Sequence, residues 1–123
     1  MKNPLTVSVI GPGALGGAII DLVMRHTDFK LYSVWGRNRA DSYLITSSDD
    51  VSVPPHDTPE SENDLGRFII LALPDDLISA TADTLSKLPL NWEDKMVIHL
   101  SGSKNNRELI SISEKGGQTA SMH

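Results

Sequence analysis

LTVSVIGPGALG, residues 5–16, is the stretch that decides the expected fold. Its first half, Leu5–Ile10, is rich in β-branched residues, which is typical of a strand buried on both faces of a parallel sheet. Glycines then interrupt the apolar run. From Ala14 onward, apolar side chains recur three to four residues apart, as in a helix with one buried face. The stretch therefore predicts a strand, a tight glycine turn and a helix.

The glycines of this turn have the spacing GxGxxG. Between a strand and a helix, the first glycine permits the sharp turn, the second lets the backbone approach a pyrophosphate, and the third lets helix and strand pack closely. We therefore expect the pyrophosphate of a dinucleotide at the N-terminus of the helix. The alternative is a glycine-rich turn without a ligand. The residues assigned to this loop are Gly11, Pro12, Gly13, Ala14, Leu15 and Gly16.

The end of the second expected strand, Leu31–Trp35, bears on the choice of nucleotide. A site for NAD usually offers an acid about twenty residues after the glycines to bind the ribose hydroxyls. Here the strand continues as Gly36-Arg37-Asn38-Arg39. The two arginines can pair with a 2′-phosphate, and Asn38 can donate a hydrogen bond to it. We therefore expect NADP(H) to be preferred over NAD(H), the alternative being that the arginines form a solvated surface pair.

The rest of the chain continues the alternation of strands and helices. Three further strands are expected at 67–73, 96–100 and 118–122, and two further helices at 75–88, capped by Asp75 or Asp76, and at 107–112. Between them, 38–44 is expected as a short helix and 47–63 as an irregular surface excursion that holds the third strand at 51–53. This alternation predicts a parallel sheet covered by helices, a doubly wound Rossmann fold of three layers, α/β/α, in one domain over 1–123.

Composition limits the classes of function. A chain of 123 residues with 39% hydrophobic residues can build one ordinary core. The formal net charge of −5 disfavours nucleic acid or an anionic membrane as a partner. The absence of cysteine excludes disulfides and thiolate metal sites. Because no apolar run has the length of a signal-peptide core or a membrane span, we expect a soluble cytoplasmic protein without a membrane partner.

With these motifs in place, the chain resembles the NADP-dependent reductases related to 6-phosphogluconate dehydrogenase and pyrroline-5-carboxylate reductase, and an uncharacterised Rossmann-like subfamily most of all. Four strings carry the likeness: VIGPGALG at 9–16, VWGR at 34–37, LALPDD at 71–76 and HLSGS at 99–103. The final residues 120–123 are similar to the segment at which that subfamily passes toward its second domain. The likeness thus runs nearly from end to end of the chain.

The resemblance implies roles for several residues. Arg37 would bind the 2′-phosphate, Leu73 and Pro74 would line the ribose and nicotinamide, and Ser101 and Gly102 would approach the nicotinamide or the substrate. For Leu73 and Pro74, the alternative is that they simply end a strand. For Ser101, the alternative is that it only caps the next helix.

A departure from these families concerns their helical second domain, which completes the substrate pocket and often forms the dimer. This chain stops at His123, so we expect a fragment, a partner or homo-oligomer that supplies the missing wall, or a stand-alone nucleotide binder. The first functional hypothesis is an NADP(H)-dependent oxidoreductase domain for a small carbonyl, imine or hydroxy compound. The second is a non-catalytic NADP(H) sensor or interaction module.

No catalytic set is evident in the sequence. His99 lies inside an apolar strand and is expected to be a hydrogen-bonded core residue rather than a proton donor. The four histidines do not have metal-ligand spacing, so no metal site is expected. The proton donor and the substrate therefore stay unassigned.

Overall fold

The structure is a computed structural model that describes residues 5–11, 13–26, 28–45, 50–101 and 106–122. Its strands are β1 (Leu5–Ile10), β2 (Phe29–Trp35), β3 (Tyr43–Ile45), β4 (Val51–Ser52), β5 (Phe68–Leu71), β6 (Met96–His99) and β7 (Gln118–Ser121). Its α-helices are α1 (Gly13–Arg25), α2 (Asp75–Ser86) and α3 (Ile110–Glu114). Short 3₁₀ segments are η1 (Arg39–Asp41), η2 (Glu62–Asp64), η3 (Trp92–Asp94) and η4 (Asn106–Leu109).

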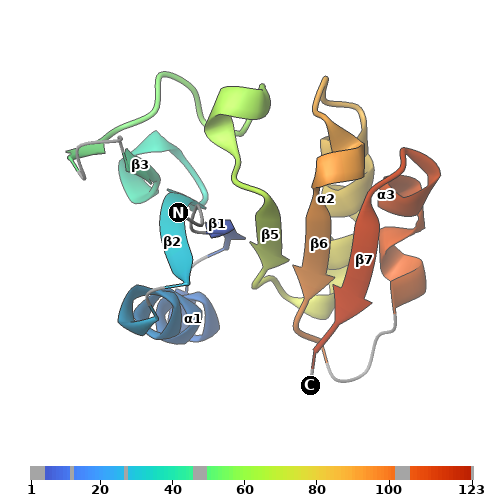
Figure 1. The fold of residues 1–123 in the computed structure, drawn as a ribbon, viewed down its shortest axis with the longest axis horizontal. Helices are drawn as coiled ribbons and strands as arrows, with labels where there is room; N and C mark the ends of the chain where they lie inside the picture. Colours follow the sequence, from blue (N-terminus) through green and yellow to red (C-terminus); the bar gives the residue numbers. More distant parts are fainter. Residues whose placement is uncertain (1–4, 12, 27, 46–49, 102–105, 123) are drawn as a thin grey trace.

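The strands form one mostly parallel sheet (Figure 1). Its seven strands have the order β4-β3-β2-β1-β5-β6-β7. From β2 across the sheet through β1, β5 and β6 to β7, every pair of neighbouring strands is parallel. β3, in contrast, pairs antiparallel with β2 and with β4. The expected α/β class and its mostly parallel sheet are therefore confirmed, and the expectation of a fully parallel sheet is wrong at the β3–β4 edge.

A tight turn after β2 explains this correction. The hydroxyl of Ser42 accepts a hydrogen bond from the Gly36 N–H at 2.9 Å and donates one to the Asn38 carbonyl at 2.8 Å. The chain therefore reverses within a few residues, too few for the crossover that a parallel strand needs. Val34 then pairs with Tyr43 in an antiparallel register. The short helix expected at 38–44 is consequently only η1 followed by the first residues of β3.

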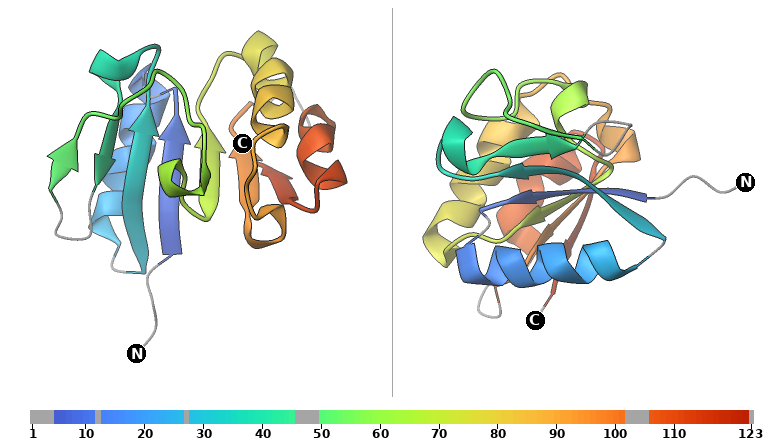
Figure 2. Two further views of the ribbon diagram at one scale, coloured as in Figure 1. Left: turned by 90° about the horizontal axis from the view of Figure 1, so that it is seen from above. Right: turned by 90° about the vertical axis from the view of Figure 1, so that its left-hand side faces the viewer.

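The core has two parts, divided by the sheet. Alternate side chains of β5 point to opposite faces: Ile69 and Leu71 join the cluster that contains α2 and α3, whereas Phe68 and Ile70 pack against the cluster that contains α1. The views in Figure 2 likewise place α1 apart from α2 and α3 across the sheet. The connections that follow the strands therefore lead to helices on both faces of the sheet.

Two details of the helices differ from expectation. Helix α2 has Pro74 as its N-cap, without a side-chain cap hydrogen bond, so neither Asp75 nor Asp76 is the cap. Both acids lie in the first turn, where a negative charge interacts favourably with the helix dipole. The last helical segment begins as η4, and its end is followed by Gly116 with a φ of 98°, as expected for a glycine stop. Among the described residues, no helix is long and apolar enough to cross a membrane.

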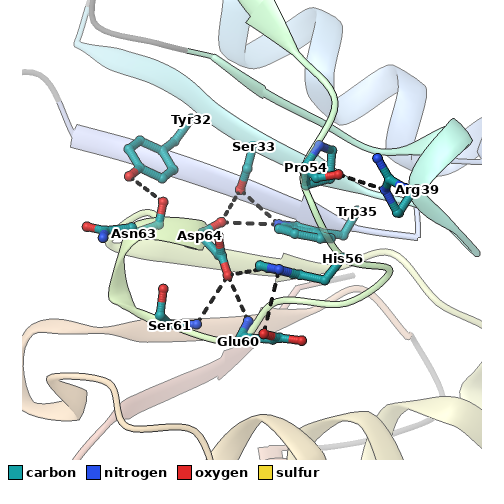
Figure 3. A network of polar contacts seen from close by, with 10 residues as sticks. All are labelled: Tyr32, Ser33, Trp35, Arg39, Pro54, His56, Glu60, Ser61, Asn63 and Asp64. Atoms are coloured by element: carbon teal, nitrogen blue, oxygen red, sulfur yellow. Dashed lines mark hydrogen bonds and ion pairs between the residues drawn. The ribbon is translucent and has the colours of Figure 1, made fainter.

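A network of polar contacts fixes the segment between β4 and β5 (Figure 3). The Asp64 carbonyl accepts hydrogen bonds from Ser33 Oγ at 2.8 Å and from Trp35 Nε1 at 3.1 Å. Its carboxylate accepts from the Glu60 N–H and bonds His56 Nε2, each at 2.8 Å. The His56 ring stacks on Trp35 with centroids 5.9 Å apart. This network fixes a loop beside the end of β2.

An ion pair joins η2 to the residue that precedes β6. Lys95 is 3% exposed and its Nζ bonds the Glu62 carboxylate, which also accepts the Asn91 N–H at 3.0 Å. Burial by itself raises the pKa of Glu62, but the hydrogen bonds from Lys95 and Asn91 and the charge of Lys95 outweigh it and lower the pKa below 4.5. The folded state therefore favours the ionised carboxylate.

This pair predicts an acid-sensitive contribution to stability. A carboxyl whose pKa is lowered by folding stabilises the fold above its unfolded pKa, and this contribution disappears as the pH falls through the folded pKa. We expect Glu62→Gln to lower the free energy of unfolding at pH 7 by about 1–3 kcal/mol, because the variant leaves the buried Lys95 ammonium without its carboxylate although water reaches position 62. The difference from the wild type should shrink at pH 3, measured by urea denaturation at both values. A difference that stays constant with pH would contradict the assignment.

Candidate functional site: a cleft at the carboxyl ends of β1, β2 and β5

A cleft opens where the connections of two neighbouring parallel strands diverge. β1 leads into α1 on one side of the sheet and β5 leads into α2 on the other. In open α/β sheets, ligands bind at such a switch point, outside the carboxyl ends of the strands. The cleft has a volume of about 640 Å³. It is lined by Ile10, Gly11, Gly13, Trp35, Gly36, Arg37, Asp41, Ala72, Leu73, Pro74 and Leu77.

The three glycines of the loop have different surroundings. A Cβ at Gly11, where φ is 81°, would lie 2.7 Å from the Ala72 carbonyl oxygen, and a Cβ at Gly16 would lie 2.7 Å from the Gly11 carbonyl oxygen. Both glycines are therefore required by packing of the protein itself. A Cβ at Gly13, where φ is 33°, would have nothing within 4 Å. Gly13 thus faces open space in the cleft, at the N-terminus of α1.

Arg37 lies at the β2 end of the cleft. Its side chain is exposed, and it makes no hydrogen bond or ion pair with any residue that the structure describes. The neighbouring Asp41 also lines the cleft, since the turn after β2 returns the chain to this point. A cation and a carboxylate therefore stand at the same end of the cleft.

The other two residues of the expected 2′-phosphate set have structural contacts. Asn38 Oδ1 accepts the Ala40 N–H at 2.9 Å and so caps η1. Arg39 Nε donates to the Pro54 carbonyl at 2.9 Å, and the Arg39 N–H donates to Asp57 Oδ1 at 3.0 Å. Arg39 therefore ties the turn after β2 to the loop that follows β4, and it is not among the described residues that line the cleft.

Leu73 and Pro74 form the opposite wall of the cleft together with Leu77 from the first turn of α2. Ser101 is buried at the end of β6, and its N–H donates to Nδ1 of the fully buried His99 at 3.2 Å. His99 is thus a hydrogen-bonded core residue, as expected. The described part of the next helical segment begins at Asn106, and residues 102–105 lie outside the described residues, so the cap role of Ser101 stays a prediction.

Two of the assigned site residues, Pro12 and Gly102, lie outside the described residues. For Ala14 and Leu15 the structure describes only the backbone, in the first turn of α1. The cleft is therefore defined by the remaining loop glycines and by the residues that follow β2 and β5.

A second cavity of about 280 Å³ adjoins the first. The two share Ile10, Trp35 and Gly36, so they lie next to each other, and together we call them the groove, which extends from the glycine turn to α2. The further lining residues are Asp57, Thr58, Pro59, Ala80, Thr81, Thr84, Leu85 and Leu88. Sequence patterns did not indicate this wall, because the loop at 57–59 is placed by long-range contacts, which are the network around Asp64 (Figure 3) and the Arg39–Asp57 hydrogen bond.

The charges of the groove are unevenly distributed. Its titratable lining residues, within the described part of the chain, are Arg37 and Asp41 in the larger cavity and Asp57 in the smaller one. The end formed by Leu73, Pro74 and Leu77 is apolar. Over the same residues, no three His, Cys, Asp or Glu side chains are grouped to hold a metal ion. The groove can therefore bind a charged group at its β2 end and an apolar ring surface at its β5 end.

The fold and the groove define the chain as an α/β protein with a ligand-sized cleft at a switch point of the sheet. No family model and no curated protein matches the sequence.

Proposed function

We propose that this chain is a dinucleotide-binding domain of the doubly wound, three-layer Rossmann type, and that it binds NADP(H) for an oxidoreductase. The observation that carries the proposal is the position of Gly13. It lies at the N-terminus of a 13-residue helix, faces open space, and lines the cleft between β1 and β5. A helix N-terminus offers unpaired N–H groups to a pyrophosphate, provided that no side chain intervenes.

The groove suggests how the rest of the cofactor lies. With the pyrophosphate at Gly13, the adenosine 2′-phosphate would reach the exposed guanidinium of Arg37, which has no partner among the described residues. The adenine would extend toward the smaller cavity, between the loop at 57–59 and α2. The nicotinamide would lie toward Leu73 and Pro74, where the wall is apolar and excludes water from one ring face.

The nicotinamide supplies the hydride chemistry, and the protein orients the ring and holds the acceptor. The Leu73 end of the cleft offers no titratable side chain among the described residues, so the groove there can position a ring but not exchange a proton. The acceptor, a small carbonyl, imine or hydroxy compound, would thus take its proton from a group outside this wall. The same observation favours a second candidate function, a non-catalytic NADP(H) sensor or interaction module.

Calorimetric titration of the chain with NADPH and with NADH tests the proposal. We expect tighter binding of NADPH. Arg37→Ala should weaken NADPH binding by about 1–3 kcal/mol, the range for a lost charged hydrogen bond, and leave NADH binding nearly unchanged. Arg25→Ala is the matched control, because Arg25 is an exposed arginine in the last turn of α1, at the end of the helix away from the cleft.

The outcomes separate the parts of the proposal. Failure of the wild type to bind either dinucleotide would overturn the proposed function. Equal losses of NADPH and NADH affinity in Arg37→Ala would contradict the 2′-phosphate assignment alone.

A further inference from the structure

The acid that commonly binds the ribose hydroxyls of NAD is expected at the end of the second strand, about twenty residues after the glycines. In this chain Gly36 follows the last residue of β2 and stands at that place, with no side chain. The structure nevertheless brings a carboxylate to it. Asp41, five residues further along the chain, lies against Gly36 and lines the same cleft.

The contact between the two residues is close. A Cβ built on Gly36 would lie 2.5 Å from Asp41 Cβ and 2.9 Å from the Asp41 carbonyl oxygen. The side chain of Asp41 therefore begins where a side chain at position 36 would begin. No larger residue fits at 36 unless Asp41 moves.

The turn between β2 and β3 holds Asp41 in this position. The Asp41 N–H donates to the Asn38 carbonyl at 3.1 Å, and the Ser42 hydroxyl bridges the Gly36 N–H and the same carbonyl. Ser42 is 3% exposed, so the bridging hydroxyl is itself shielded from water. The placement of Asp41 thus follows from its backbone hydrogen bond and from the Ser42 bridge rather than from its own side chain.

The carboxylate of Asp41 is available to a ligand. It is exposed, and within the described part of the chain it forms no hydrogen bond and no ion pair, including with Arg37. The two opposite charges at the β2 end of the cleft therefore do not neutralise each other through a direct contact. The Arg37 guanidinium and the Asp41 carboxylate can therefore each interact separately with the adenosine ribose or its phosphate.

We propose that Asp41 is a specificity-determining residue that favours NAD(H) and opposes NADP(H). Its carboxylate accepts hydrogen bonds from the ribose hydroxyls of NAD(H), and it repels the 2′-phosphate that Arg37 attracts. The two residues thus act against each other, and the chain binds both dinucleotides with a reduced preference for NADP(H). This inference rests on the proposed dinucleotide-binding function.

The test compares Asp41→Asn with the wild type by titration with NADPH and NADH. Asparagine has the same shape without the charge. We expect the Kd for NADPH to fall about tenfold, the size of one charge repulsion across several ångströms at a partly exposed site. The Kd for NADH should rise about threefold, because a neutral amide oxygen is the weaker acceptor. The NADPH effect should diminish at high salt, where exposed charges are screened.

Asp28→Asn is the matched control, since Asp28 is exposed and precedes β2, at the amino ends of the strands and away from the cleft at their carboxyl ends. It removes the same unit of net charge and should leave both constants unchanged. Asp41→Ser is a second variant that removes the charge with a smaller side chain, and it should shift the two constants in the same directions.

The outcomes distinguish this inference from the function on which it rests. A wild-type chain that binds neither dinucleotide overturns both. A wild-type chain that binds at least one of them, together with Asp41 variants whose ratio of Kd values for NADPH and NADH is unchanged, overturns the role of Asp41 and leaves the proposed function standing.

Discussion

Gly13→Asp is expected to weaken the binding of NADPH and of NADH alike by at least about 100-fold, or about 2.7 kcal/mol, while the protein stays folded. A Cβ at Gly13 has nothing within 4 Å, but the φ of 33° strains any other residue there, so Gly13→Ala, which has the same backbone strain without the charge, is the reference for the loss. Gly13→Asp places a carboxylate at the N-terminus of α1, where we propose that the pyrophosphate lies. Two such charges about 4 Å apart repel by about 4 kcal/mol near a protein surface. The measurement is calorimetric titration, accompanied by circular dichroism.

Gly17→Asp controls for the added charge, since Gly17 does not have the positive φ of Gly13. Gly17 is an exposed residue of the same helix, a Cβ there also has nothing within 4 Å, and it does not line the described cleft. It adds the same charge to α1 and should reduce affinity only slightly. If Gly13→Asp and Gly17→Asp bind the dinucleotides equally well, the phosphate site is not at the glycine turn.

Trp35→Ala is expected to lower the free energy of unfolding by about 3–5 kcal/mol, the usual cost of truncating a large buried aromatic residue. Trp35 is 1% exposed, its Nε1 donates to the Asp64 carbonyl, and the His56 ring stacks on it. The variant leaves a cavity and removes a contact that holds the loop before β5. The loss is a large share of the stability of a small domain. Urea denaturation followed by far-ultraviolet circular dichroism measures it.

A pair of milder variants isolates the hydrogen bond of Trp35. Trp92 is also buried, but its Nε1 has no hydrogen-bond partner among the described residues. Trp35→Phe should therefore cost about 1 kcal/mol more than Trp92→Phe, the net value of one buried hydrogen bond, which Nε1 shares between the Asp64 carbonyl and Ser33 Oγ. Equal costs for the two phenylalanine variants would show that packing alone accounts for the contribution of Trp35.

Local patterns predicted most of the elements, because the spacing of apolar side chains depends only on neighbours in the sequence. The runs at β1, β5 and β6 and the periodicity of α1 and α2 all correspond to observed elements. The direction of β3 was not predictable in this way. It follows from the Ser42 hydrogen bonds in the turn after β2, and polar turn residues are compatible with several chain paths.

The candidate site likewise contains residues that sequence motifs indicated and residues that only tertiary contacts bring to it. The glycine spacing and Arg37 are contiguous motifs, and both line the observed cleft. Asp41 carries no signal in the sequence, since its position against Gly36 depends on the antiparallel return of the chain. The wall at 57–59 depends on the contacts of Asp64 with two residues of β2, which lie about thirty residues away along the chain.

The sequence by itself thus determined the α/β class, the strand–turn–helix unit at residues 5–25 and the presence of a glycine turn with a following arginine, because each is encoded by residues a few positions apart. Only the tertiary structure decided that Gly13 is the glycine that faces open space and that Arg39 is bound to the Pro54 carbonyl. It also decided that the Asp41 carboxylate lines the cleft together with Arg37. The physical reason is that pairing direction and long-range hydrogen bonds bring together side chains whose separation along the chain carries no periodic signal.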